Sequence, residues 1–306
     1  MAAYQAALAG ETAPKRHVGA ERWRSGSLGS LIAAYLGSAE FRALAPLTQR
    51  TYRNMLERLR AEHGEKPVAQ LEARHIRRML DGMADRTGAA NNLLKRLRGV
   101  MQFAVDHGWR DDNPAQFIRP IRRNSSGFRT WTEDDIAAFT AKWPLGSRAH
   151  LALMLLLYSA QRRSDVVLLG RQHLKNGAVH VRQQKTKTRL AIPVHPALQA
   201  ALDLVPADQM TFLVTQAGKP FSAAGFTNWF VECAKAAGLP ENSTPHGLRK
   251  AAARRLAEAG CSAHQIMAIT GHKTLSEVAV YTAAADQERL ARSAMAAMPG
   301  AATNVR

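Results

Sequence analysis

Apolar residues recur at helical spacing over most of the first third of this chain, and this periodicity limits what that part can fold into. Four stripes succeed one another between Leu28 and about Phe117, each with apolar residues three and four positions apart. They are Leu28, Leu31, Ile32, Tyr35 and Leu36; then Tyr52, Met55, Leu56 and Leu59; then Ile76, Met79, Leu80 and Met83; and last Leu93, Leu94, Leu97, Val100, Met101 and Val105. Such stripes are typical of amphipathic helices that share one core. Residues 27–118 are therefore predicted to form a small all-helical domain.

The rest of the chain mixes helical patterns with short strand signals. Thr132 and Asp135 have the spacing of a capping box, which predicts the helix that opens a second domain. Asn176–Gly177 favours a hairpin, and a second turn at 185–188 separates two short strand-like stretches. Further helix start and stop signals follow at Ser222, Thr244 and Gly260. The predicted fold class is mainly α with a small antiparallel β-sheet, an α+β architecture.

Two segments without apolar periodicity separate these parts. Residues 1–26 are rich in small and basic residues and contain three glycines and one proline, which predicts a loosely ordered extension. Residues 119–130 combine turn-forming residues with four arginines and are predicted to be a basic linker. The expected domains are thus residues 27–118 and 131–298, followed by a tail at 299–306.

The charge balance points to a polyanionic partner. Lysine and arginine outnumber aspartate and glutamate by 42 to 24, a formal net charge of +18. Nucleic acid is the first candidate and an anionic membrane surface the second. Cations beside the last apolar stripe and in the linker are candidate DNA-binding residues, although cations on a helix are more often an ordinary solvated face. They are Lys95, Arg96, Arg98, Arg119, Arg122 and Arg123.

Several classes of protein are excluded by what the sequence lacks. The longest apolar run, Leu151–Tyr158, is far shorter than the roughly 20 residues that cross a bilayer, and the N-terminus lacks a signal-peptide core. The two cysteines, Cys233 and Cys261, have no C-x-x-C spacing, which excludes a disulfide framework and a structural zinc site. We therefore expect no membrane partner and a soluble cytoplasmic protein, associated with the nucleoid.

The common catalytic motifs are also absent, and carboxylates are too scattered for a two-metal nuclease. A catalyst would have to use cations, imidazoles and a hydroxyl. Such groups stand at Arg162 with Asp165, at His246 with Arg249, and at Gly271-His272 and Tyr281. The second pair follows a helix cap, where anions such as phosphate are favoured. Each also has an ordinary structural explanation: an ion pair, a capping histidine with a surface arginine, or a core tyrosine.

In chain order, these residues resemble the active-site signature of the tyrosine recombinase (phage integrase) family. The likeness extends over roughly residues 28–298, because the family also has a helical core-binding domain, a linker and a catalytic domain in this order. The resemblance implies a clamp of the two domains around duplex DNA. It also implies cutting and rejoining through a 3′-phosphotyrosyl link, with no cofactor, metal ion or ATP. The matching series is Arg162, Lys185 in a hairpin turn, His246-Gly-Leu-Arg249, Gly271-His272 and Tyr281.

Three of these residues are expected to act on the scissile phosphate, and a fourth is expected to orient one of them. Arg162 and Arg249 suit its nonbridging oxygens, because a guanidinium donates two hydrogen bonds and stays charged at any working pH. His272 is expected to donate to a phosphate oxygen. Asp165 is expected to orient Arg162, because a carboxylate that faced the phosphate would be repelled.

The other residues are expected to move protons. Tyr281 is the expected nucleophile, and a phenol with a pKa near 10 needs a base or the field of the arginines. His246 is the candidate base. Lys185, in its turn, is the candidate general acid for the leaving 5′-oxygen. A solvated turn lysine is the alternative, and Lys187 is the nearest other acid and a further candidate for DNA binding.

The chain departs from the family pattern in three places. Ser159-Ala160 stands where the family often has Thr-Gly. Arg163 follows Arg162 directly, so the choice between them depends on the three-residue distance to Asp165. A separate N-terminal arm-binding domain is not evident, and residues 1–26 are at most its remnant.

The resemblance also suggests partners. Residues 286–298 place Leu290, Ala294, Met295 and Met298 on one side, as an amphipathic helix that family members often dock onto a neighbouring protomer. The expected partners are double-stranded DNA at specific recombination sites, further copies of this chain in a tetrameric synapse, and accessory DNA-bending or directionality factors.

Three functions stay open at this point. The first is a site-specific DNA recombinase, as the integrase of a prophage or other mobile element. The second is a chromosome-dimer resolvase, or another tyrosine-dependent strand transferase or topoisomerase, with the same chemistry. The third is a non-catalytic DNA-binding regulator in which the histidines and Tyr281 are structural.

Overall fold

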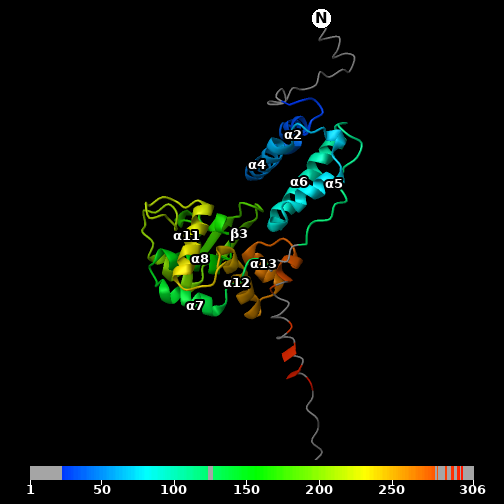
Figure 1. The fold of residues 1–306 in the computed structure, drawn as a ribbon. Coiled ribbons are helices and arrows are strands. Elements are labelled where there is room, and N and C mark those ends of the chain that lie inside the picture. The colour runs from blue at the N-terminus through cyan, green and yellow to red at the C-terminus, as the bar shows by residue number, and fades with distance from the viewer. Residues whose placement is uncertain are drawn as a thin grey trace, which may run out of the picture. The chain divides into compact units, whose positions relative to one another are not determined.

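The computed structural model describes residues 23–122 and 127–279, together with 281, 287, 291–292, 295–296 and 298. The chain divides into two compact units, residues 1–125 and 126–306, which Figure 1 shows as ribbons. Four expectations fall outside the described residues, wholly or for the most part: the extension before residue 23, Arg123, the helix over 286–298 and the tail at 299–306.

The first unit is helical, as predicted. Each of the four apolar stripes becomes one helix face packed on a common core, in which Leu31, Leu56 and Ile76 have no exposed surface. The first helix begins where the Ser27 side chain accepts a hydrogen bond from the backbone of Ser30. The elements are α2 (Leu28–Leu36), α3 (Ala39–Arg42), α4 (Pro46–His63), α5 (Ala73–Asp81) and α6 (Thr87–Asp106), with short 3₁₀ turns at Val68–Gln70 and Ala84–Arg86.

The second unit folds around α8, a helix in which ten of 12 residues are buried. Helices α10, α11 and α12 pack against it. The longest apolar run of the sequence, Leu151–Tyr158, lies in α8 and thus forms the centre of a core and not a membrane span. The helices are α7 (Glu133–Lys142), α8 (Arg148–Ser159), α9 (Arg163–Val166), α10 (Pro196–Asp203), α11 (Ala223–Ala236), α12 (Pro245–Glu258) and α13 (Ala263–Thr270).

A three-stranded antiparallel sheet completes this unit, in the order β1 (Leu174–Lys175), β2 (Ala178–Arg182) and β3 (Arg189–Pro193). Asn176 and Gly177 connect β1 to β2 with φ angles of 51° and 71°, the backbone that a tight hairpin requires. The predicted hairpin is therefore confirmed. Alternate residues of β2 are buried, so the sheet packs one face on the core.

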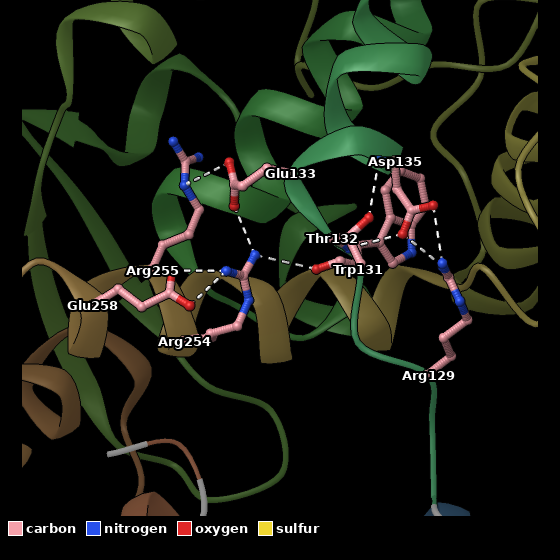
Figure 2. Close-up of polar contacts among 8 residues, drawn as sticks. All are labelled: Arg129, Trp131, Thr132, Glu133, Asp135, Arg254, Arg255 and Glu258. Atoms are coloured by element: carbon pink, nitrogen blue, oxygen red, sulfur yellow. Dashed lines mark hydrogen bonds and ion pairs between the residues drawn. The ribbon is translucent and has the colours of Figure 1, made fainter. Parts of the chain in front are cut away.

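Polar side chains fix α12 to the start of α7 (Figure 2). Thr132 and Asp135 form the predicted capping box, and Asp135 also pairs with Arg129 over 2.7 Å. Farther along α12, Arg254 pairs with Glu133 over 2.6 Å and with Glu258 over 2.7 Å. Because α12 carries His246 and Arg249 in its first two turns, these contacts hold the helix that positions two of the predicted site residues.

Candidate active site

All six predicted catalytic residues belong to the second unit. Four of them, Arg162, Arg249, His272 and Tyr281, are linked by a hydrogen bond or by charge interactions centred on Arg249. Arg162 caps α9, and Arg249 lies in the second turn of α12. His272 follows the end of α13, and Tyr281 comes nine residues later. Lys185 is exposed in the turn between β2 and β3.

Arg249 is the buried centre of this cluster, with 3% of its surface exposed. Its guanidinium donates to the carbonyl oxygens of Ala160 over 2.6 Å and Thr270 over 2.8 Å. A further N–H group points to Nε2 of His272 over 3.2 Å. Burial, and secondly the charge of Arg162, lowers the pKa of Arg249 to about 10, so the side chain is still a cation at neutral pH.

His272 is held in one tautomer. A guanidinium can only donate, so Nε2 of His272 accepts from Arg249 and the ring proton sits on Nδ1. Nδ1 lies 2.8 Å from Oγ1 of Thr270, which in turn donates to the carbonyl oxygen of Ile266. Burial and the charge of Arg249 lower the pKa of His272 to about 4. In this state its Nε2 can receive a proton, and donation from Nε2 to a phosphate requires protonation first.

Tyr281 stacks on His272, with 6.2 Å between ring centroids and 24° between ring planes. The pKa of the Tyr281 hydroxyl is raised, mainly by burial and further by the charge of Glu277. The charge of Arg249 lowers this pKa but does not outweigh the other two effects. The phenol is therefore protonated at neutral pH, and a nucleophilic role needs a base.

His246 lies at an exposed position, where its ring contacts the ring of Phe128 at 4.5 Å between centroids. Partial burial and the charges of Arg249 and Lys250 lower its pKa, which favours the neutral form that a base requires. Lys250 donates to the carbonyl oxygen of Phe128 over 2.7 Å, so the segment before α7 lies against the first turns of α12.

The glycine between His246 and Leu248 has a packing reason. A Cβ at Gly247 would lie 2.2 Å from the carbonyl oxygen of Arg129 and 2.8 Å from the ring of Trp131. No side chain fits there, because the backbone of residues 129–131 crosses the start of α12 at this point.

Arg162 and Arg163 are now distinguished by their surroundings. Arg162 is half-buried and donates to Oε1 of Gln183 over 3.2 Å, whereas Arg163 is exposed. Asp165 is buried and accepts from the backbone amide of Gln184 over 2.8 Å, and it makes no ion pair with Arg162. Burial raises the pKa of Asp165 above its ordinary value. Its direct link is thus to the turn that carries Lys185.

The left-handed backbone of Ala160, with φ of 51°, ends α8. This is the position where the family often has glycine, the residue that adopts this conformation most easily. The conformation turns the carbonyl of Ala160 to Arg249 and starts the segment of Arg162.

Three buried polar residues of the cluster escaped the sequence analysis: Gln161, Gln183 and Thr270. A signal for one of them existed. Val179 and Val181 are buried, and Gln183 occupies the next position of the same alternation. An amide on the buried side of a strand must find partners inside the protein.

The predicted DNA-binding residues that the structure describes have mixed surroundings. Lys95, Arg119, Arg122 and Lys187 are exposed. The guanidinium of Arg96 lies over the ring of Tyr52, 3.8 Å from its centroid. Arg98 donates to the carbonyl oxygen of Ala115 over 3.1 Å and also to that of Ile118. It therefore holds the segment that follows α6 against this helix.

The described residues contain neither a membrane-spanning helix nor a cluster of metal ligands. No helix among them is long and apolar enough to cross a membrane. No three histidine, cysteine, aspartate or glutamate side chains within the described ranges are grouped so that they could hold a metal ion.

Comparison with known families gives two matches that together span most of the chain. Residues 131–288 match the phage integrase family, and residues 31–120 match the phage integrase central domain. The first match contains every residue of the cluster described above.

Curated relatives cover the chain to different extents. "Tyrosine recombinase XerD" of Xanthomonas campestris pv. campestris is 29% identical over 64% of this chain and 67% of its own length. "Integrase" of Escherichia phage HK022 is 25% identical over 70% of this chain and 64% of its own length. "Tyrosine recombinase XerC" of Ralstonia pickettii is 27% identical over 82% of this chain and 88% of its own length.

Solved structures share the fold. A dimer of lambda integrase residues 75–356, bound to a COC′ core site, matches with a TM-score of 0.74 and 23% identity, over 84% of this chain and 95% of that one. Tn1549 transposon integrase, in complex with a circular intermediate DNA, matches with a TM-score of 0.73 and 19% identity, over 87% of this chain and 100% of that one.

Proposed function

The chain belongs to the phage integrase family, and from this premise we propose that it recombines specific sites in duplex DNA through a 3′-phosphotyrosyl intermediate on Tyr281. Enzymes of this family cleave and rejoin DNA in this way, and this chain is a tyrosine recombinase. The assignment of catalytic roles to these residues rests on one observation: Arg249 contacts His272, and Tyr281 stacks on the ring of His272. A regulator with structural histidines would not need a buried cation beside a tyrosine.

The arginines would stabilise charge on the phosphate. In the transition state the nonbridging oxygens and the leaving oxygen carry most of the charge. Two of the five N–H groups of Arg249 have no acceptor among the described residues and are available to an oxygen of the phosphate. Arg162 would bind the second nonbridging oxygen, and its burial beside Gln183 limits the orientations that it can adopt.

Proton movements complete the step. Oη of Tyr281 attacks phosphorus while the bond from phosphorus to O5′ breaks. The phenolic proton goes to a neutral imidazole, for which we propose His246, and Lys185 gives a proton to O5′. The covalent bond keeps the energy of the broken one, so that a second 5′-hydroxyl can reverse the same steps and rejoin the strand. His272 would contact a phosphate oxygen once protonated.

The test is covalent trapping. A binding site is first selected from a random duplex pool, and a nick is then placed beside the cleavage position so that the released fragment diffuses away. Wild-type protein is expected to accumulate a protein–DNA adduct in excess EDTA. Tyr281→Phe is expected to form none while its affinity stays within a few fold, because one hydroxyl is lost among many phosphate contacts. An adduct with the phenylalanine variant would assign the nucleophile to another residue.

DNA and further copies of the chain are the proposed partners. The solved relatives include a dimer on a core site and a tetramer of lambda integrase on a Holliday junction. By analogy, we propose that this chain assembles as a tetramer on two sites. Exposed cations Lys95, Arg119, Arg122 and Lys187 would bind backbone phosphates in this assembly.

Integration of a mobile element is the proposed biological role, and resolution of chromosome dimers is the second candidate. The likeness to the Ralstonia XerC over 82% of the chain favours the second, and the likeness to phage HK022 integrase favours the first. Mapping the selected site separates them. Repeats of the site at both ends of a mobile element support an integrase, whereas a single copy near the replication terminus supports a resolvase.

A further inference from the structure

Two glutamines with no exposed surface join the segments that carry the catalytic candidates. Nε2 of Gln183 donates to Oε1 of Gln161 over 2.7 Å. Nε2 of Gln161 donates to the carbonyl oxygens of Ser159 over 2.9 Å and Ile269 over 2.8 Å. Leaving such a buried group without a partner costs about 1–3 kcal/mol, so each bond restricts the others. The amides therefore fix the end of α8 relative to the end of α13.

Every hydrogen-bonding position of the Gln183 amide is occupied. Nε2 donates to Gln161 and also to the carbonyl oxygen of Thr270 over 2.8 Å. Oε1 accepts from Nη1 of Arg162 over 3.2 Å and from the hydroxyl of Thr186 over 2.5 Å. The reverse orientation would put the amide oxygen against two acceptors and its nitrogen against a guanidinium. Only the observed orientation satisfies all four partners.

These partners come from the segments that carry Arg162, His272 and Lys185. Arg162 is the proposed phosphate ligand, and the carbonyl of Thr270 also accepts from Arg249. Thr186 follows Lys185 in the turn, and the backbone of Gln183 closes that turn through bonds with Thr188 and Lys187, both 2.9 Å. One side chain thus touches the groups that would bind the phosphate and the loop that would supply the acid.

Gly271 gives independent support for this close arrangement. A Cβ at Gly271 would lie 2.5 Å from Nε2 of Gln183, so the glycine before His272 leaves the space that the amide fills. Its φ of 69° is also in the left-handed region. Both constraints act at the point where the Gln183 side chain meets the backbone that leads to His272.

We propose that Gln183 is a positioning residue for strand cleavage, which orients Arg162 towards the phosphate and holds the Lys185 turn at the leaving oxygen. This inference rests on the proposed function. Without the amide, Arg162 keeps its charge but loses its only side-chain acceptor within the described residues. Thr186 loses an acceptor at the same time, and the turn gains freedom.

The test compares Gln183→Met with Gln184→Met in the full chain. Methionine is similar to glutamine in length but has neither the amide donor nor its oxygen. The Gln184 side chain is exposed, which makes the second variant a matched control. On the nicked duplex, Gln183→Met is expected to form the adduct about 10- to 100-fold more slowly, by analogy with the loss of hydrogen bonds that orient metal ligands in enzymes. Its DNA affinity should stay close to that of Gln184→Met, whereas its Tm should be lower, because the buried partners of the Gln183 amide lose their hydrogen bonds.

Two modified substrates separate positioning from a general loss of structure. Sulfur in place of the bridging 5′-oxygen leaves without a proton, so it removes the need for the Lys185 turn. A methyl group in place of a nonbridging oxygen removes the charge that Arg162 would neutralise. The defect of Gln183→Met, relative to wild type, should shrink on each substrate. An equal defect on all three substrates, or none on the ordinary one, overturns the proposal.

Thr186→Val provides a second variant if Gln183→Met does not fold. It removes the hydroxyl that donates to Gln183 from a partly exposed position and leaves the contact with Arg162 in place. Its defect should disappear with the sulfur substrate and persist with the methyl substrate; the opposite pattern contradicts the proposal. If wild-type protein forms no adduct at all, the proposed function fails. If wild type forms it and both glutamine variants match wild type, this inference alone fails.

Discussion

Burial and the charge of Arg249 hold His272 in the neutral form in the free protein. The guanidinium has no lone pair, so its contact with Nε2 is a hydrogen bond only while that nitrogen is unprotonated. The hydroxyl of Thr270 accepts a hydrogen bond from the protonated Nδ1 of His272 and donates one to the carbonyl oxygen of Ile266 in α13. The imidazole beside Tyr281 is therefore neutral in the free protein, and its Nε2 is occupied by the hydrogen bond from Arg249.

This arrangement predicts an unusual titration. His272 is expected to stay neutral down to a pKa of about 4, because burial and the charge of Arg249 disfavour the imidazolium. The pKa is lower in the folded than in the unfolded chain, where it is near 6.5. Acidification from about pH 6.5 towards pH 4 therefore favours the unfolded chain. The ¹⁵N shifts of the His272 ring, identified with His272→Gln, measure the titration, and a midpoint near 6.5 contradicts the expectation.

Ala160 supports a second prediction at this scale. Replacing a buried alanine by glycine loses about 0.8 kcal/mol of methyl burial and about 0.5–1 kcal/mol of backbone entropy. At Ala160, with its left-handed φ of 51°, relief of about 1–2 kcal/mol of strain offsets these losses. Ala160→Gly should therefore change the free energy of unfolding by less than about 1 kcal/mol, by the same estimates.

Ala152→Gly is the matched control for Ala160→Gly. Ala152 is equally buried in α8 but has ordinary helical geometry, so its substitution should cost about 2 kcal/mol. Urea unfolding of both variants measures the difference. Equal losses at the two positions would show that Ala160 carries no backbone strain.

At the scale of elements, the turn between β2 and β3 combines Lys185, the proposed general acid, with the buried side chain of Gln183. Lys185 is exposed, whereas Gln183 two residues earlier is fully buried. Asp165 also binds this turn through the backbone of Gln184. The arrangement suits a general acid whose side chain must reach the substrate while the ends of its turn are held in place.

The turn predicts a specific chemical rescue. If Lys185 protonates the leaving 5′-oxygen, Lys185→Ala should slow adduct formation by about 10²- to 10⁴-fold, the usual range for general-acid loss. With the 5′-sulfur substrate, its rate should approach that of wild type, because a thiolate leaves unprotonated. Arg162→Ala is the control and should not be rescued, since its charge acts on nonbridging oxygens. Equal slowness of Lys185→Ala on both substrates would move the role to another group, first to Lys187.

The sequence could predict elements whose signals are local. The capping box of Thr132 and Asp135 lies within one helical turn, and the Asn176–Gly177 hairpin needs only two adjacent residues with positive φ. The Gln161–Gln183 network could not be predicted in the same way. Its partners lie 22 residues apart, and Gln161 reaches Ile269 across 108 residues. Only the packing of α8, α13 and the sheet brings these groups together.

At the scale of the whole molecule, two compact units share a formal charge of +18. The charge attracts DNA in general, since neutralised phosphates release counterions whatever the sequence. In the proposed mechanism, cleavage by contrast depends on a few groups in the second unit. Salt should therefore weaken binding steeply, whereas the rate of adduct formation by DNA-bound protein should change little.

The C-terminal segment supports the last prediction. Among its described residues, Met295 and Met298 are 68% and 64% exposed, and both lie on the apolar side of the helix predicted for 286–298. Large apolar side chains at such exposure lose contact with water when a second protomer covers them. Deletion after Ala285 should therefore leave binding to one site unchanged, but should reduce the pairing of two sites and the yield of recombinant product. Gel mobility separates singly bound from paired complexes.

Substitution of both methionines by serine keeps the length of the chain and removes only the apolar surface, so it should reproduce the deletion. If the double variant pairs sites normally while the deletion does not, the segment acts through some other part of residues 286–306. If the deleted protein recombines as well as wild type, assembly does not depend on this segment. Adduct formation on a single nicked site provides the internal reference in each case, because loss of that reaction would indicate damage to Tyr281, only four residues before the truncation.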